Sequence, residues 1–140
     1  MAATTDIVVV GAGRVTPDGH GPEHINLADQ QHDPDSLWSF IRELIGVRRQ
    51  RPEFGWGAFE VLDQPERAVL AHRITLDDSC VVAAHNLGAD PISITLTDVL
   101  SDGDTLVDLL NGDAVLPHDG TLDLALEGYG FRWFRVQPAA

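Results

Sequence analysis

The order of elements constrains this chain more strongly than any single motif. A strongly apolar helical pattern occupies residues 37–50, and short runs of β-forming residues follow it as far as residue 136. One helix followed by many short strands, with no helical pattern between them, predicts a mainly β protein. We expect an antiparallel β-sandwich of about seven strands over residues 55–137, preceded by one long N-terminal α-helix over residues 33–51. Residues 1–32 are predicted to be irregular, with room for one short strand at residues 7–10.

Capping residues mark both ends of the predicted helix. Asp33 is a good N-cap, because its carboxylate can accept hydrogen bonds from the exposed N–H groups of the first turn. Pro34 suits the first helical position, where its missing N–H costs nothing. Pro52 disfavours helical geometry at Arg51 and therefore predicts the end of the helix.

The apolar face of this helix is wide. At about 100° per residue, its apolar side chains cover roughly half of the circumference, whereas packing on one neighbour needs a stripe of about 100°. We therefore expect two packing surfaces, one on this domain and one elsewhere; the alternative is a helix sunk deeply into its own domain. The predicted interface residues are Leu37, Trp38, Phe40, Ile41, Leu44 and Ile45.

Seven runs rich in β-forming residues follow the helix, and turn residues separate them. Ile92–Leu96 alternates between apolar and polar residues, which predicts one buried and one solvated face. Residues 80–84 are apolar at consecutive positions, which places that strand in the middle of a sheet. In the last run the alternation puts an aromatic residue on each face, so one face can meet the helix or a neighbouring domain. The runs are 56–62, 68–76, 80–87, 92–96, 106–110, 122–126 and 131–136.

The charge of the chain excludes some classes of partner. Twenty-two acidic and nine basic residues give a net charge of −13. A surface this acidic repels phosphate backbones and anionic headgroups, so we expect neither nucleic-acid nor membrane partners. No apolar run approaches the ~18 residues that span a bilayer. Cys80 is the only cysteine, so no internal disulfide can form; we expect a small buried side chain there and a cytoplasmic location.

No motif in the sequence predicts catalysis, a cofactor or a bound metal. Residues 11–16 are similar to a dinucleotide-binding turn, but the third glycine is absent and prolines prevent the helix that should follow. His20 and His24 are flanked by glycine and proline, so they cannot share a helix face as zinc ligands. The acidic residues lie mostly in turns, and no serine occupies a nucleophile elbow. Trp56 and Trp133 could stack against a sugar, although core packing is the alternative for both rings.

An ordered set of segments runs through most of the chain. They are 21–30 (GPEHINLADQ), 33–49, 51–57 (RPEFGWG), 68–73, 82–87 (VAAHNL), 106–110 (LVDLL) and 128–134 (GYGFRWF). In this order they resemble the C-terminal part of a trehalose synthase-like enzyme of glycoside hydrolase family 13, the α-amylase superfamily. The first segments are similar to the last barrel helix and the loop before it, and the later ones to the C-terminal β-domain. The likeness covers about residues 21–136, and residues 1–20 depart from it.

The resemblance implies a C-terminal β-sandwich that follows a (β/α)8 barrel carrying three catalytic acids. No position of this chain matches those acids, so it implies a non-catalytic accessory domain. The parent reaction would be similar to maltose–trehalose interconversion or to hydrolysis of α-glucosides. The expected partner is a (β/α)8 barrel in cis or in trans, or a second copy bound through the helix. Two alternatives stay open: a free-standing carbohydrate-binding module, and a docking or dimerisation module that uses the apolar helix.

Overall fold

The computed structural model describes residues 21, 26–99, 101 and 103–139. The chain divides into two compact units, Met1–Arg42 and Glu43–Ala140, with the boundary inside the longest described helix. The helices in the described residues are α1 (Leu27–Gln30), α2 (Leu37–Arg49) and α3 (Glu53–Trp56). The strand predicted at residues 7–10 and the glycine-containing turn after it lie outside the described residues, as do His20 and His24.

The helix predicted over residues 33–51 forms over a shorter range, and Asp33 is not its N-cap. The Asp33 carboxylate accepts a hydrogen bond from the Asp35 N–H at 2.9 Å, which holds a turn before the helix. Ser36 caps the helix instead, because its Oγ accepts from the Ser39 N–H at 3.2 Å and its carbonyl accepts from the Phe40 N–H. Aspartate and serine are equally good N-caps, so only the path of the chain decides between them.

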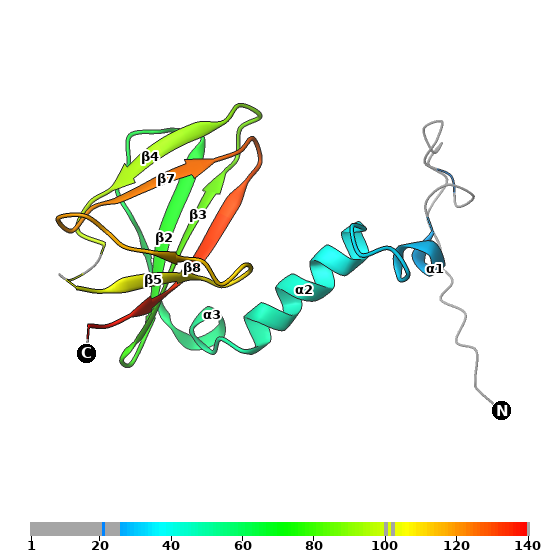
Figure 1. Cartoon of the computed structure of the whole chain (residues 1–140), viewed down its shortest axis with the longest axis horizontal. Helices are drawn as coiled ribbons and strands as arrows, with labels where there is room; N and C mark the ends of the chain where they lie inside the picture. The colour runs from blue at the N-terminus through cyan, green and yellow to red at the C-terminus, as the bar shows by residue number, and fades with distance from the viewer. Residues whose placement is uncertain (1–20, 22–25, 100, 102, 140) are drawn as a thin grey trace. The chain divides into compact units, whose positions relative to one another are not determined.

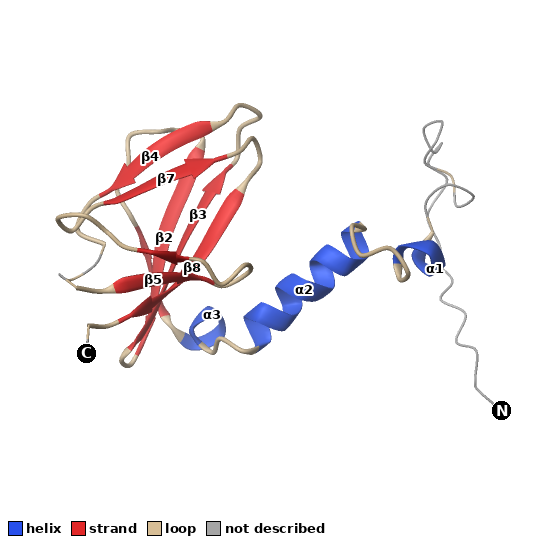
Figure 2. Cartoon of the chain, in the orientation of Figure 1, coloured by secondary structure: helices blue, strands red, loops and turns tan. Residues whose placement is uncertain are grey.

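The Glu43–Ala140 unit is an antiparallel sandwich, which confirms the predicted fold class (Figure 1). Six strands form one sheet in the order β1-β2-β3-β8-β5-β6, and two strands form a second sheet, β4-β7. Figure 2 shows that strands, drawn in red, are the main regular secondary structure of this unit. The strands are β1 (Ala58–Val61), β2 (Val69–Leu76), β3 (Ser79–Asn86), β4 (Ile92–Leu96), β5 (Thr105–Asp108), β6 (Ala114–Val115), β7 (Leu122–Leu126) and β8 (Phe131–Gln137).

Two details of the strand prediction are wrong. Trp56 lies in α3 and not at the start of a strand, because Pro52 begins a further helical turn that ends at the extended Gly57. The β6 strand was not predicted; it is two residues long and pairs with Leu106 and Val107 of β5. A strand this short carries no alternating pattern, so the described chain has eight strands where the sequence predicts about seven.

The core lies between the two sheets and follows the predicted alternation. Ile94 and Leu96 of β4 are buried, whereas Ser93 and Thr95 between them are exposed. The consecutive apolar residues of β3 are buried because that strand lies inside the larger sheet, between β2 and β8. Phe134 of β8 has no exposed surface and packs among the residues of the two sheets.

A polar clasp at one end of the sandwich joins the end of β3 to the start of β8. The side-chain amide of Asn86 donates to the carbonyl oxygens of Asp90 at 2.8 Å and Glu127 at 2.9 Å. Its oxygen accepts from the Gly88 N–H at 2.9 Å. Gly128 packs so closely here that a Cβ on it would lie 1.8 Å from the Ala89 carbonyl oxygen. The segments VAAHNL and GYGFRWF therefore meet in this clasp and hold two loops together.

Replacing Asn86 with alanine is expected to lower the free energy of unfolding by about 2–4 kcal/mol, because three hydrogen bonds of a buried amide are lost. Urea unfolding followed by circular dichroism measures the change. Asn111→Ala is the control, since the Asn111 side chain accepts one hydrogen bond in an exposed turn; its expected effect is below about 1 kcal/mol. Equal losses in the two variants would contradict the role of the clasp.

Candidate docking surface

The apolar face of α2 is largely uncovered. None of its thirteen residues is buried, and exposure reaches 67% at Leu37 and 49% at Ile45. Trp38 and Leu44 are half-buried, and the Arg42 guanidinium lies 5.2 Å from the centre of the Trp38 ring. Phe40 and Ile41 are exposed as well. The described residues do not enclose the predicted stripe, and the interface role of its residues stays a prediction.

A basic recess lies where α2 ends and α3 follows. The recess has a volume of about 380 Å³, which lies in the range of small-molecule sites. The ring of Trp56 lines it and is 83% exposed. Three arginines gather here in a chain that carries only nine basic residues. The lining residues are Ile45, Arg48, Arg49, Arg51, Pro52, Gly55 and Trp56.

Trp133 lies in a different environment from Trp56. It is half-buried, with the ring of Phe54 at 5.1 Å and the ring of Phe131 at 5.5 Å. The indole N–H donates to Nε2 of His85 at 3.4 Å. The two tryptophans predicted to contact sugar are therefore unlike: Trp56 presents an exposed ring, whereas neighbouring rings surround Trp133. Sugar stacking on either ring stays a prediction.

An aromatic row crosses the face of the six-stranded sheet that points away from β4 and β7; we call this the outer face. His72 lies between the ring of Phe59 at 4.9 Å and the parallel ring of His85 at 5.6 Å. The row continues from His85 to Phe131, whose ring is 5.8 Å away. Phe59 is 60% exposed, and its neighbour Val61 on the same face is equally exposed. An antiparallel sheet with one solvated face normally carries polar residues there, so this face is unusually apolar.

Both histidines of the row favour the neutral form. Burial lowers the pKa of His72, and the nearby His85 lowers it further by repulsion of a second positive charge. Burial also lowers the pKa of His85. The Nδ1 atom of His72 is buried and has no hydrogen-bond partner in the described structure. Sequence reasoning missed this row, because its members come from four strands and no local pattern in the sequence joins them.

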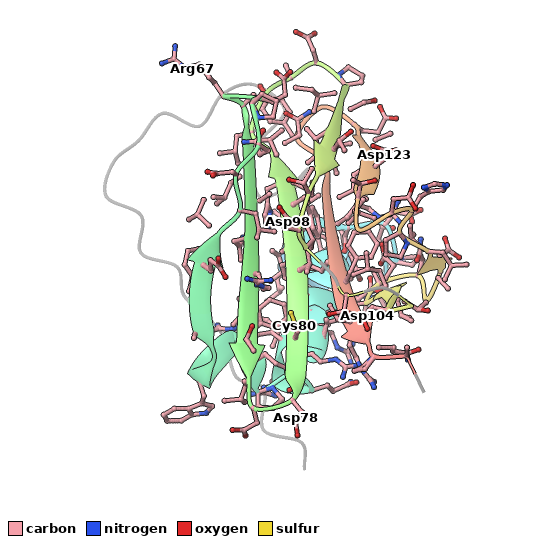
Figure 3. All side chains as sticks on the ribbon, turned by 90° about the vertical axis from the view of Figure 1, so that its left-hand side faces the viewer. Arg67, Asp78, Cys80, Asp98, Asp104 and Asp123 are labelled. Atoms are coloured by element: carbon pink, nitrogen blue, oxygen red, sulfur yellow. The ribbon has the colours of Figure 1, made fainter. Side chains whose placement is uncertain are left out.

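Cys80 is half-exposed, not fully buried as the sequence predicts. It lines a recess of 310 Å³ with Arg73, Asp98 and Asp104 among its neighbours, and Figure 3 labels Cys80 with both carboxylates. Burial raises the pKa of the Cys80 thiol, although a hydrogen bond from Thr75 and the charge of Arg73 act the other way. A raised pKa keeps the thiol protonated, which does not favour nucleophilic chemistry.

The described residues contain neither a cluster of metal ligands nor a helix that could span a membrane. Among them, no group of three or more histidine, cysteine, aspartate or glutamate side chains could hold a metal ion. None of the helices in the described part of the chain has the length and apolarity to cross a membrane.

Comparison with known proteins shows which family this chain is similar to. Residues 79–135 match the family described as the sucrose hydrolase-like C-terminal domain. A trehalose synthase of Pimelobacter sp. is 34% identical over 84% of this chain, which corresponds to 21% of the relative. A trehalose synthase of Thermus thermophilus is 29% identical over 87% of this chain and 13% of the relative. The solved trehalulose synthase MutB of Pseudomonas mesoacidophila aligns with a TM-score of 0.63 and 28% identity, over 81% of this chain and 20% of that one.

This chain carries the C-terminal domain of a trehalose synthase-like enzyme. The order of segments from residue 21 onward predicts this family, and the comparisons confirm it. The described residues form no (β/α)8 barrel, and the chain spans about a fifth of the Pimelobacter relative. The C-terminal domain is therefore an accessory part of trehalose synthase and amylase family proteins.

Proposed function

We propose that this C-terminal domain is a non-catalytic accessory unit of an enzyme that acts on maltose, trehalose or related α-glucosides. It stabilises a (β/α)8 barrel, supplied by the same protein or by a separate chain, by packing against it through the apolar face of α2. The relatives that support this substrate class are trehalose synthases. A cytoplasmic location is part of the proposal and is supported by the single cysteine, which allows no internal disulfide.

The uncovered stripe on α2 is the observation that carries the proposal. Four of its apolar residues are at least 40% exposed and form an apolar surface on one helix. They are Leu37, Phe40, Ile41 and Ile45. Contiguous apolar patches of this kind mark interaction sites. The relatives are several times longer than this chain, so most of their length lies outside the region that this chain matches. A barrel is therefore the partner that fits both the surface and the relatives.

The expected result of a binding experiment is a one-to-one complex between this chain and the barrel of the Pimelobacter relative without its own matching region. Isothermal titration calorimetry gives the dissociation constant. Ile45→Glu should weaken binding at least about tenfold, because a carboxylate would have to be buried in the interface. The thermal midpoint of the sandwich should change little, because Ile45 is 49% exposed in the chain alone.

Gln50→Glu is the matched control, since it adds the same charge at an exposed position on the same chain. Its affinity should equal that of the unmodified chain. Equal loss of binding in the two variants, or unfolding by Ile45→Glu, would contradict a specific contact through α2. Turnover of maltose by the purified 140-residue chain would contradict the non-catalytic role.

The exposed Trp56 favours one alternative, a carbohydrate-binding module. Its ring lines a recess of 380 Å³ and is 83% exposed, and an exposed aromatic ring with a polar surround can stack against a sugar. Calorimetry with maltose and trehalose tests this alternative. Heat of binding that disappears in Trp56→Ala but not in Trp133→Ala would support it, and no binding heat would leave the barrel-docking role. Self-association through α2 would appear as a dimer in light scattering of the chain alone.

A further inference from the structure

The basic recess at the end of α2 is formed within one compact unit. Its lining residues all lie between residues 45 and 56, and Glu43–Ala140 is a single unit. Figure 1 shows α3 following the C-terminal end of α2. The Arg51 N–H donates to the Arg48 carbonyl oxygen at 3.2 Å, and the Phe54 N–H donates to the Arg51 carbonyl oxygen at 3.2 Å. The link between the two helices is therefore hydrogen-bonded, and it gives the recess a defined backbone.

The short helix α3 leaves one large ring outside the sandwich. Glu53 is 3% exposed, and the ring of Phe54 lies 5.1 Å from the ring of Trp133. These contacts attach α3 to the six-stranded sheet, and the ring of Trp56 at the end of the same helix is 83% exposed. An indole ring in this position offers a large apolar face on which the C–H groups of a sugar ring can stack.

The three arginines of the recess carry charge that the described residues do not neutralise. The ion pairs in the described part of the chain involve other side chains, so Arg48, Arg49 and Arg51 pair with no carboxylate there. Glu53 is close in sequence, but its carboxylate is buried and does not line the recess. The dipole of α2 supplies only about half a negative charge at its C-terminal end. Three guanidinium groups exceed this several-fold, so the recess is positive.

A positive recess on this chain is selective for small anions. The net charge of −13 makes most of the surface repel them, but salt at about 0.1 M screens this repulsion beyond about 10 Å. An anion in the recess therefore responds mainly to the arginines, whose planar groups bind phosphate oxygens through paired hydrogen bonds. A volume of about 380 Å³ lies at the small end of ligand sites, which favours a small molecule over a protein segment.

We propose that this recess binds the phosphate monoester of a sugar about the size of a hexose. Arg48, Arg49 and Arg51 hold the phosphate group, and the sugar ring stacks on Trp56. A neutral sugar would leave the three charges unpaired, and inorganic phosphate would leave the Trp56 ring uncovered. A sugar phosphate satisfies both features. The inference concerns the chain alone and does not rest on the barrel contact.

The experiment is isothermal titration calorimetry of the 140-residue chain with glucose 6-phosphate at about pH 7.5, where a phosphate monoester carries almost two negative charges. Glucose and inorganic phosphate are titrated separately. Glucose 6-phosphate should bind at least about tenfold more tightly than either, because each of them engages only half of the site. Sodium chloride at about 0.5 M should weaken the binding, because it screens the arginines.

Two charge variants test the arginines. The double variant Arg48→Gln with Arg49→Gln should weaken binding of glucose 6-phosphate at least about tenfold, because it removes charge-assisted hydrogen bonds. Arg42→Gln with Arg67→Gln is the matched control, since it removes the same net charge at two exposed residues outside the recess; Figure 3 labels Arg67. The control should bind like the unmodified chain. Circular dichroism checks that all variants are folded.

A second set of variants tests the space and the ring. Gly55→Leu should weaken binding at least about tenfold by filling the recess without changing its charge. The fold has room for it, because a Cβ on Gly55 meets no atom within 4 Å. Gly46→Leu is the control, at an equally open position that does not line the recess. Trp56→Ala should lower the affinity for glucose 6-phosphate to that for inorganic phosphate.

Three outcomes would overturn the inference. Equal affinities in the two arginine double variants would show an effect of net charge alone. Equal affinities for inorganic phosphate and glucose 6-phosphate would exclude the sugar contact, and binding that survives Gly55→Leu would place the ligand elsewhere. The absence of binding heat with all three ligands would also contradict it. The barrel contact is measured without any sugar phosphate, so each of these results leaves the proposed function standing.

Discussion

Replacing Phe134 with alanine is expected to lower the free energy of unfolding by about 3–5 kcal/mol, among the largest effects of any single substitution in this domain. Phe134 has no exposed surface, and it lies on β8 between β3 and β5, opposite Val82 and Asp108. Removing its ring deletes apolar contacts to both sheets and leaves a cavity that close-packed neighbours cannot fill. Urea unfolding monitored by circular dichroism at 222 nm or by tryptophan fluorescence gives the change.

Phe59→Ala is the matched control for this substitution. It removes the same ring from the same sheet, but at a residue that is 60% exposed on the outer face. Its expected cost is below about 1 kcal/mol. A similar loss in both variants would show that the two faces contribute equally to the stability of the chain alone, which contradicts a core confined to the space between the sheets.

The second large effect is expected at Asp108. Its carboxylate is 3% exposed and accepts a hydrogen bond from Nε of Arg132 at 2.6 Å. It also accepts from the N–H groups of Leu110 and Asn111, at 2.9 Å and 3.3 Å, in the turn between β5 and β6. Asp108→Ala leaves these donors without their acceptor and leaves the arginine unpaired, which should cost about 3–5 kcal/mol.

Two further variants make the Asp108 prediction specific. Asp63→Ala removes an exposed carboxylate and should change the free energy of unfolding by less than about 0.5 kcal/mol. The double variant Asp108→Ala with Arg132→Leu should recover part of the loss, because no buried charge remains unpaired. Free energies of unfolding for the unmodified chain, for the single variants Asp108→Ala and Arg132→Leu and for the double variant give the coupling energy. Strict additivity of the two single changes would rule out the ion pair as its source.

The arrangement of most strands could be predicted because local patterns carry it. The alternation in β4 and β7 identifies their buried faces, and the consecutive apolar residues of β3 identify a central strand. The start of the helix was less predictable, since Asp33 and Ser36 are both good N-cap residues. Asp108 interrupts an apolar run in sequence and is the last residue of β5, where it is buried and pairs with Arg132, 24 residues away.

The candidate surface could be predicted only in part. The helical stripe is local and periodic, so its six residues can be found from sequence, and Leu37, Phe40, Ile41 and Ile45 are exposed in the structure. The outer face is assembled by register between strands that are distant in sequence. Phe59, His72 and His85 become neighbours only once β1, β2 and β3 are paired. Strand pairing is a long-range property, and no window of the sequence contains it.

The clasp around Asn86 gives a structural role to two segments of the sequence, VAAHNL and GYGFRWF. The amide of Asn86 needs two loop carbonyl oxygens within reach, and Gly128 needs to stay bare so that the Ala89 carbonyl can approach. None of these contacts touches a candidate ligand. These two segments therefore specify how the end of the sandwich is held together and say nothing about a reaction.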